Sequence, residues 1–304
     1  MPSVITHNEL GRRVLARLPA GSVADERAFL LGAQGPDLFF FFRAYPWMLG
    51  KAGLPIGNAL HEARPSALLD AFFHWRDTCP AAYRAVVDSY VRGFLCHYAA
   101  DRVIHPFVHH LQEQLRVCDP AFANTTDPYH YVCESALDVA LLHARGERAS
   151  SFRLISLMPP ATAVQRDALA WLYHRLLHTV LDIDLPEATL RHLVSDFRQT
   201  LWFMNDRLGI KRPLLHTVER VLRIEPRFSA LVRTDKTEYM DFENAQNALW
   251  VRAEGSETHA DFGALCDEAV ALAVSLIDGF ENGQNGLTLT DDVDFTGQPY
   301  EGGQ

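Results

Sequence analysis

Histidines and carboxylates recur at a spacing of four residues in two stretches of this sequence. The first stretch contains His97, Asp101 and His105, and the second contains His130 and Glu134. An α-helix turns about 100° per residue, so a step of four returns to nearly the same face, about 40° further on. Imidazole and carboxylate groups are ligands for zinc. The spacing therefore predicts two helical ladders of ligands that face each other and form a metal site inside a helix bundle.

Two further candidate ligands stand upstream near glycine-containing turns. Asp37 follows Gly35-Pro36 between two apolar runs, and His61 follows a loop predicted at Gly50 to Gly57. A bare charge between apolar runs is costly to bury, so Asp37 must be paired, capping or metal-bound. Taken alone, Asp37 is most simply interpreted as a helix cap or an Asx turn.

His7 is the earliest candidate in the chain. Thr6, with Glu9 three residues later, predicts a capping box at the start of a short amphipathic helix, and this places His7 in its first turn. A single histidine in that position is commonly a polar surface residue. Its interest comes from the other candidates that follow it.

Together these residues offer more ligands than one metal ion uses. Zinc binds four or five ligands at about 2.0–2.2 Å, so the candidates suit two or three ions. Carboxylates can bridge ions about 3.5–4 Å apart, which gives Asp101, in the middle of its ladder, a bridging role. A histidine and carboxylate mixture without thiolate fits Zn²⁺ best, with Mn²⁺ and Fe²⁺ as alternatives. The candidates are His7, Asp37, His61, His97, Asp101, His105, His130 and Glu134.

The segments that carry the candidates have the apolar period of helices. One long helix is predicted from Ala81 to about Leu115, with a kink at Pro106 just after His105, because proline removes a backbone hydrogen bond. Tyr129 to about Arg145 is the next helix. The predicted fold class is all-α: a multi-helix bundle that encloses a multinuclear metal site, with additional C-terminal helices. Those later helices are predicted at Pro160 to Ile183, Pro186 to Leu208 and Asp261 to Phe280.

The chain divides by character into three parts. Residues 1–150 form the predicted metal-binding helical core, and we expect residues 151–283 to pack on it within the same domain. Residues 284–304 are rich in Gly, Asp and Thr without an apolar period, which predicts a flexible acidic tail. Lys211 to Lys236 contains seven basic and three acidic residues. A solvated surface is the simplest interpretation of that stretch, and a phosphate-facing role is the alternative.

Composition limits the class of protein. At 304 residues the chain can bury a large core, and its 48% hydrophobic and 22% charged residues are ordinary for a globular protein. A net charge of −10 argues against general nucleic-acid binding. The N-terminal residues lack the basic and apolar regions of a signal peptide, and no apolar run approaches the ~20 residues of a membrane span. The five cysteines are scattered without CxxC spacing. These features predict reduced thiols and a cytoplasmic location.

The candidates, in this order, resemble the zinc-dependent phospholipase C family, which includes bacterial phosphatidylcholine-hydrolysing enzymes with three zinc ions. The zinc-dependent single-strand nucleases share that fold more distantly. The resemblance covers roughly residues 1–145 and implies a helical fold around several zinc ions. The matching pieces are Ile5-Thr6-His7, Gly35-Pro36-Asp37, His61, His97-Tyr-Ala-Ala-Asp101, His105-Pro106 and His130-Tyr-Val-Cys-Glu134.

The resemblance also implies a distribution of ligands. One zinc would be held by Asp37, His61, His97 and Asp101. A second would be held by His130 and Glu134 with either His105 or His109, and His105 is preferred because the proline after it fixes its position. The third would be held by His7 and the shared Asp101. Secreted members complete this third site with an N-terminal tryptophan, which this sequence lacks, so we expect two or three zinc ions.

The implied activity is hydrolysis of a phosphodiester by a metal-activated water. Asp37 would take the proton from that water, and Glu62 is a less favoured base. Phe39 to Phe42 and Tyr98 would form an apolar wall beside the substrate. The expected substrate is a phospholipid headgroup or a small phosphodiester, with peripheral membrane contact and no specific nucleic acid.

Two alternatives remain open at this stage. One is a nuclease or nucleotide phosphodiesterase that uses the same metal site. The other is a helical binding or scaffold protein whose metal site is structural.

Overall fold

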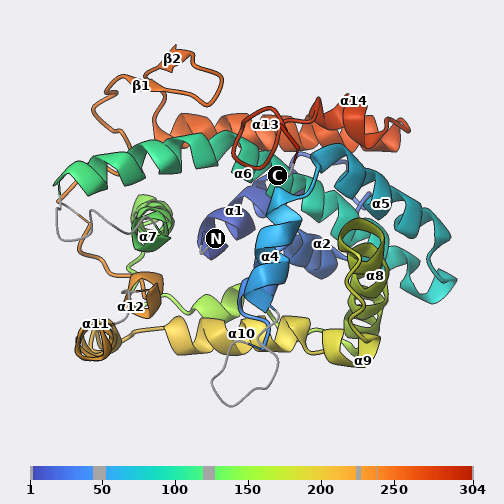
Figure 1. Cartoon of the computed structure of the whole chain (residues 1–304), viewed down its shortest axis with the longest axis horizontal. Helices are drawn as coiled ribbons and strands as arrows, with labels where there is room; N and C mark the ends of the chain where they lie inside the picture. Colours follow the sequence, from blue (N-terminus) through green and yellow to red (C-terminus); the bar gives the residue numbers. More distant parts are fainter. Residues whose placement is uncertain (1–2, 44–52, 119–126, 224–226, 238, 303–304) are drawn as a thin grey trace.

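Helices dominate the computed structural model, which describes residues 3–43, 53–118, 127–223, 227–237 and 239–302 (Figure 1). The only strands in these ranges are β1 (Trp250–Val251) and β2 (Glu257–Thr258), which pair antiparallel. The all-α prediction is therefore confirmed. None of the described helices is both long and apolar enough to cross a membrane.

The helices of the first half include the segments that carry the candidate ligands. They are α1 (Val4–Leu15), α2 (Glu26–Gly32), α3 (Asp37–Phe40), α4 (Gly53–Glu62), α5 (Pro65–Thr78), η1 (Ala81–Tyr83), α6 (Arg84–Cys118) and α7 (Asp127–Ala144). The second half contributes η3 (Leu154–Leu157), α8 (Ala163–Leu181), α9 (Glu187–Leu190), α10 (Leu193–Met204), α11 (Lys211–Leu222), α12 (Arg227–Leu231), α13 (Phe262–Glu281) and α14 (Gly286–Thr290).

The 35-residue helix α6 is the central helix of the fold. In Figure 1 it runs side by side with α13, and it also contacts α1, α2 and α7. It continues through Pro106 as one helix. One contiguous core joins the early and late helices, and it includes Val4 of α1, Phe94 of α6, Tyr173 of α8 and Val270 of α13. Residues after 150 thus pack on the same core as the ligand-bearing helices.

Glycines bring α2 close to α6. A Cβ atom at Gly32 would lie 2.1 Å from the carbonyl oxygen of Tyr90, and one at Gly93 would lie 2.0 Å from that of Phe29. The turn that follows α2 is equally tight, because Gly35 has φ +51° and its Cβ would lie 2.3 Å from the ring of His97. Only glycine fits such an approach, and it places the start of α3 against the ligand-bearing face of α6.

Helix α4 differs from its prediction. Gly50 to Gly57 was expected to be a loop, but the chain is helical from Gly53, and residues 50–52 lie outside the described part. A Cβ at Gly53 would lie 2.2 Å from the carbonyl oxygen of Phe39, so the glycine lets α4 pack closely on α3. This tertiary contact outweighs the low helix propensity of glycine.

Helix α1 also begins differently from its prediction. It starts at Val4, so Thr6 lies inside the helix and is not its N-cap. The Thr6 hydroxyl instead donates a hydrogen bond of 2.8 Å to Asp138 Oδ1 on α7.

The C-terminal segment corrects the prediction of a flexible tail. Residues 286–290 form α14, and Phe295 is buried with only 2% of its surface exposed. The Asp294 carboxylate accepts hydrogen bonds from the backbone of Thr296 and Gln298, which closes a turn around Gly297. A turn with one aromatic anchor needs no apolar period, which is why the sequence pattern did not indicate it. Residues 303–304 lie outside the described part.

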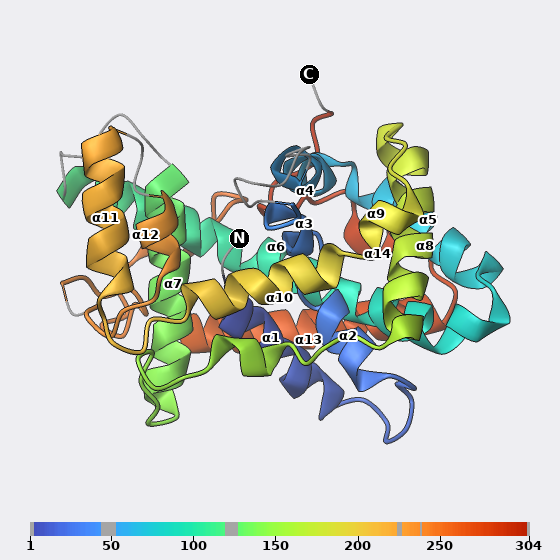
Figure 2. The ribbon, with the colours of Figure 1, turned by 90° about the horizontal axis from the view of Figure 1, so that it is seen from below.

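Helix α11 lies at one end of the molecule. Figure 2 shows it standing beside α12 and α7, at the end of α10. This end is remote from α8 and α9, which cover the opposite end in the same view.

Candidate metal centre

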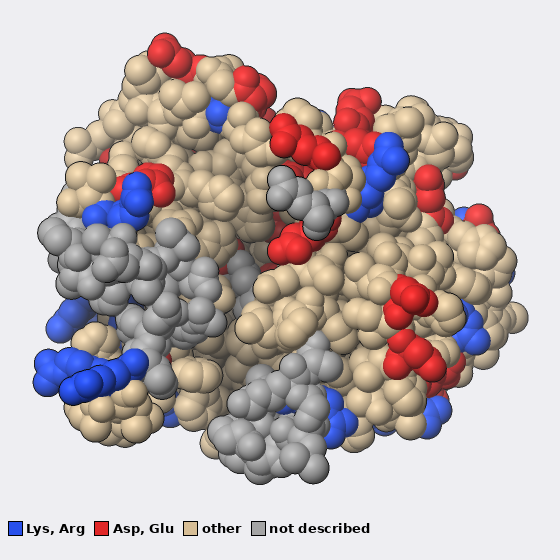
Figure 3. Space-filling view, viewed as in Figure 1, with Lys and Arg blue, Asp and Glu red and all other residues tan. Residues whose placement is uncertain are grey.

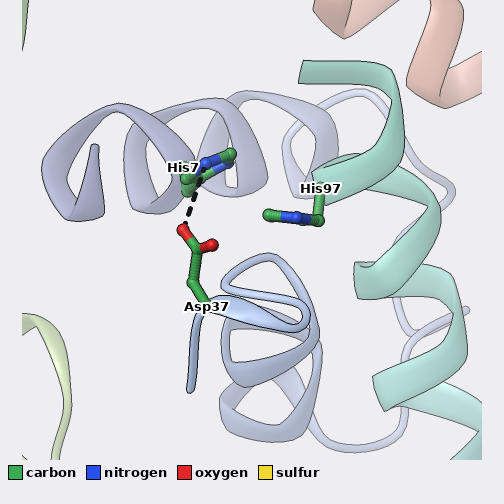
Figure 4. Close-up of side chains that lie close together, drawn as sticks. All are labelled: His7, Asp37 and His97. Carbon is green, nitrogen blue, oxygen red and sulfur yellow. Dashed lines mark ion pairs between the residues drawn. The ribbon is translucent and has the colours of Figure 1, made fainter. Parts of the chain in front are cut away.

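Three elements deliver the deepest group of candidate ligands. Figure 4 shows His7 on α1, Asp37 at the first position of α3 and His97 on α6 converging on one point. One ligand atom from each lies within 4.8 Å of the others. The Nε2 atom of His7 is 3.8 Å from Asp37 Oδ2. All three side chains are buried, so solvent does not supply their partners.

A second group shares residues with the first and adds His61 from the last turn of α4. The Nε2 atoms of His97 and His61 lie 3.1 Å and 3.5 Å from Asp101 Oδ2. His61 Nε2 also lies 3.4 Å from Asp37 Oδ1. His61 therefore stands between two carboxylates that come from different helices.

The third group joins α6 to α7. His105 Nε2 and His130 Nε2 lie 3.7 Å and 3.5 Å from the same oxygen, Oε1 of Glu134. His109, the alternative to His105, is exposed and belongs to none of the three groups among the described residues. Its ring is parallel to that of His105, with the centroids 6.2 Å apart. The geometry thus favours His105.

Asp101 links the groups to one another. Its Oδ2 atom faces His61 and His97, while its Oδ1 atom lies 3.3 Å from His7 Nε2 and 3.6 Å from His105 Nε2. The structure therefore brings all eight candidates into one centre, with Asp101 between the groups. Glu62, the alternative base, is exposed and belongs to none of the groups among the described residues.

The spacing of the ligand atoms fits a shared metal better than direct hydrogen bonds. Two atoms that share a tetrahedral zinc with bonds of about 2.0–2.1 Å lie roughly 3.3–3.4 Å apart. The nitrogen–oxygen distances above, from 3.1 to 3.8 Å, bracket that value. Charge-assisted hydrogen bonds are shorter, about 2.7–2.9 Å.

Asp37 gives a second indication of a cation. Only 1% of its surface is exposed, and within the described part of the chain neither carboxylate oxygen accepts a hydrogen bond. A buried carboxylate in that condition is costly unless a cation compensates it. The donor set and its spacing therefore fit zinc ions.

Burial and the charges of neighbouring groups shift the pKa values in the centre. Burial raises the pKa of Asp101, but His105 and His97 outweigh it and hold that pKa well below its usual range. Burial opposes protonation of His61, yet Asp101 and Asp37 raise its pKa to about 10. Burial and the neighbouring His97 lower the pKa of His7 to about 4. At pH 7 the metal-free centre thus has an ionised Asp101 and a neutral His7, which are the forms that bind metals, whereas His61 must release a proton when a metal binds.

Backbone carbonyls fix the orientation of two histidine rings. His61 Nδ1 lies 2.8 Å from the Gly57 carbonyl oxygen, and His105 Nδ1 lies 2.8 Å from that of Phe295. When Nδ1 donates its hydrogen, Nε2 carries the lone pair, and Nε2 is the atom that faces the carboxylates. Nothing in the sequence pattern connects Phe295 with His105, 190 residues earlier.

The Phe295 ring is itself part of the wall of the centre. Its centroid lies 5.2 Å from that of His61, 5.9 Å from that of His97 and 5.3 Å from that of Tyr98. Tyr98 is fully buried and its hydroxyl donates to the Val293 carbonyl oxygen at 2.5 Å. The expected place of Tyr98 beside a substrate is therefore wrong, because its hydroxyl holds the C-terminal segment.

The Phe39–Phe42 run divides between core and centre. Phe39 and Phe42 are fully buried core residues, whereas Phe40 stacks on the His61 ring with the centroids 5.4 Å apart. Phe40 therefore lies beside the candidate ligands, and its expected contact with a substrate stays a prediction.

Asp138 continues the His130 and Glu134 ladder but has another role. Its carboxylate accepts hydrogen bonds from the backbone N–H groups of Ile5 and Thr6, at 3.2 Å and 2.8 Å, and from the guanidinium of Arg233. These bonds anchor the start of α1, and His7 is the next residue. Spacing alone did not separate this positioning residue from the ligands.

The centre is open on the side of three histidines. The side chains of His61, His105 and His130 are 16%, 12% and 20% exposed, whereas those of the other five candidates are at most 4% exposed. A ligand from solvent would meet these histidines first, with the carboxylates behind them.

Comparison with known proteins agrees with this geometry. A family model described as zinc-dependent phospholipase C matches residues 6–183, which is more than half of the chain and includes all eight candidate ligands. Neither the curated proteins nor the solved structures contain a significant match. Because this family model covers more than half of the chain, the chain belongs to the zinc-dependent phospholipase C family.

Proposed function

We propose that this protein is a zinc-dependent phosphodiester hydrolase that cleaves a phospholipid between glycerol and phosphate and releases the phosphorylated headgroup. The observation that carries the proposal is the convergence of three histidine–carboxylate groups on Asp101 in one buried centre. Membership in the family supports the choice of zinc and of a phospholipid substrate.

The proposed ligand sets follow the three groups. Asp37, His61, His97 and Asp101 would hold one zinc ion. His105, His130 and Glu134 would hold a second. His7 would hold a third with Asp101, and it also lies near Asp37 and His97.

The chemistry divides between the zinc ions and the chain. Bound zinc would polarise the phosphate oxygens and lower the pKa of water toward 7. Asp37 would accept the proton of the attacking water, because its buried carboxylate has no hydrogen-bond donor in the described part of the chain. The partly exposed histidines His61, His105 and His130 would border the entry of the substrate phosphate, and Phe40 would flank it on an apolar side.

Metal content and turnover test the proposal directly. We expect the purified protein to contain two or more zinc ions per chain and to hydrolyse phosphatidylcholine or a soluble choline phosphodiester. Less than one zinc per chain, together with failure of reconstitution, would refute a metal-dependent activity. Bound zinc without any turnover would instead indicate a structural site in a scaffold protein.

Single-stranded DNA is the comparison substrate, since a nuclease could use the same centre. The net charge of −10 disfavours a long polyanion. We therefore expect the choline phosphodiester to be turned over faster than the DNA. The opposite order would assign the centre to nucleic-acid or nucleotide hydrolysis.

A further inference from the structure

The segment from Trp202 to Arg223, here named the α10–α11 surface, concentrates apolar side chains in solvent. Half of the large apolar side chains that the described structure exposes lie between residues 202 and 222. Six of them are between 59% and 79% exposed: Trp202, Leu208, Ile210, Leu214, Val221 and Leu222. A concentration of this kind marks an interaction site.

Helix α11 faces the opposite way from an ordinary surface helix. Leu214, Val218, Val221 and Leu222 recur at steps of four, three and one, which forms an apolar stripe, yet all four are exposed. The buried residue of this helix is Glu219, whose carboxylate accepts hydrogen bonds from the backbone of residues 228 and 229. The fold thus buries an acidic residue and leaves the apolar stripe for a partner.

Every exposed charge on this surface is positive. Its two acidic residues are buried, because Asp206 caps the backbone at Ile210 and Glu219 bonds to α12. The basic residues are Arg207, Lys211, Arg212, Arg220 and Arg223, and none of them forms an ion pair within the described ranges. Figure 3 shows Lys and Arg side chains gathered at the position of α11. This cationic surface stands out in a chain of net charge −10.

Aromatic and cationic groups meet at the edge of the surface. Trp202, Leu208, Ile210 and Lys211 line an open hollow of about 410 Å³. The ammonium of Lys211 lies 5.5 Å from the Trp202 ring centroid. Tryptophan and lysine are side chains that combine an apolar body with a polar end, which suits the boundary between lipid and water.

The charge pattern decides between possible occupants. A second copy bound symmetrically would place two cationic surfaces against each other, which is unfavourable. An anionic lipid surface accepts both the apolar stripe and the basic residues, as amphipathic helices at membrane interfaces do. We propose that the α10–α11 surface docks this protein on anionic phospholipid bilayers. The choice of lipid over an acidic protein rests on the proposed function.

Sedimentation with vesicles tests the proposal without any turnover. The full chain is mixed with vesicles of phosphatidylserine and phosphatidylcholine, or with vesicles of phosphatidylcholine alone. We expect strong binding to the anionic vesicles and weaker binding as salt increases, since the electrostatic part is screened. Absence of binding to anionic vesicles would overturn the proposal.

Two exposed substitutions test the surface itself. The double variant Leu214→Glu, Val221→Glu should lose about tenfold or more of its vesicle binding, because each change adds negative charge to the apolar stripe. The matched control is Val164→Glu, Leu287→Glu, at residues that are 48% and 52% exposed elsewhere on the molecule. Equal losses in the two variants would show that the surface has no special role.

Further readouts separate other occupants and the centre. Retention on poly-glutamate without vesicle binding would assign the surface to an acidic protein. A concentration-dependent dimer that the double variant Leu214→Glu, Val221→Glu (the α11 variant) abolishes, again without vesicle binding, would assign the α10–α11 surface to self-association. Turnover of a soluble choline phosphodiester tests the metal centre alone. If the wild type does not turn over this substrate, the proposed function is refuted but the docking is not. The α11 variant should keep this soluble turnover.

Discussion

Asp37 and Asp138 are both buried aspartates, but their carboxylates differ in the hydrogen bonds that they accept. They are 1% and 0% exposed. The Asp138 carboxylate accepts bonds from two backbone N–H groups, from the Thr6 hydroxyl and from Arg233. The Asp37 carboxylate accepts none in the described chain, and its neighbours are histidines at 3.4 Å and 3.8 Å.

This difference separates a carboxylate that positions a helix from one that is a candidate metal ligand. A buried carboxylate must be compensated, and the protein itself compensates Asp138. Among the described residues only histidines face the Asp37 carboxylate, and we propose that zinc completes its compensation. The two are also connected, because Asp138 holds the start of α1 and so sets the place of His7 beside Asp37. The Asp138 carboxylate, whose bonds come from the protein, thus positions His7 next to Asp37.

The largest effect should come from removing the charge of Asp37. We expect Asp37→Asn to lower turnover by about 10²–10⁴, since a general base or a metal ligand contributes on that scale. The metal-free variant should lose less stability to urea than a variant that removes the Asp138 carboxylate, because Asp101 still faces the protonated His61 after the change. Both quantities are measured on the same purified protein.

The matched control is Asp196→Asn. Asp196 is 2% exposed, and its carboxylate accepts a hydrogen bond from the Arg43 backbone at 3.1 Å, outside the centre. The Asp196→Asn variant should keep its turnover within a few fold of the wild-type value. If metal-free Asp37→Asn were strongly destabilised instead, Asp37 would be a structural carboxylate like Asp138.

The next effect is on stability and concerns Asp138. Asp138→Ala should lower the free energy of unfolding by about 3–5 kcal/mol, because Arg233 keeps its charge in a buried position without its carboxylate. Urea unfolding of the metal-free protein measures this loss. Asp267→Ala is the control, since that carboxylate is 68% exposed beside Arg13 and should cost at most about 1 kcal/mol. A similarly small loss for Asp138 would remove its anchoring role.

The contrast also shows what the sequence could predict. His97, Asp101 and His105, like His130 and Glu134, meet because a four-residue step on a helix is a local property. Those sets could therefore be predicted, and the structure brings them into one centre. That they hold zinc stays a prediction.

Distant contacts decided the rest. Asp138 has the same spacing from Glu134 as Glu134 has from His130. Its bonds to Ile5, Thr6 and Arg233, all distant in the sequence, make it structural. Thr6 fits a capping pattern, but its hydroxyl bonds to α7 inside α1. Phe295 orients His105 from a segment without any period. Local patterns carry no information on such pairs, because their energies depend on tertiary packing.

Stabilisation by zinc should also differ between variants at the two aspartates, and this difference in stability should be smaller. Zinc at a free concentration 100 times its Kd should stabilise the wild type by about 2.7 kcal/mol. The same zinc should add less to Asp37→Asn, which lacks a proposed ligand. It should stabilise Asp138→Asn nearly as much as the wild type if His7 keeps its place. Thermal unfolding with and without chelator measures these differences, and equal stabilisation of Asp37→Asn would exclude Asp37 from the ligands.

The smallest effect extends the comparison to the C-terminal support of His105. Gly297 has φ +79°, and a Cβ there would lie 2.9 Å from the Arg102 carbonyl oxygen and from the Pro106 ring. Gly297→Ala should therefore displace the turn after Phe295 and weaken zinc binding about tenfold, since contacts that orient a ligand contribute on that scale.

Gly283→Ala separates that effect from backbone strain. Gly283 has φ +77°, but nothing lies within 4 Å of its added Cβ. Both variants should lose about 1 kcal/mol of stability from the positive φ, and only Gly297→Ala should lose zinc affinity in a competitive chelator titration. If the two variants bound zinc equally well, the Phe295 carbonyl would be a passive neighbour of His105. The support of the centre would then come from the contacts of Asp138 with α1 and from the Gly57 carbonyl at His61.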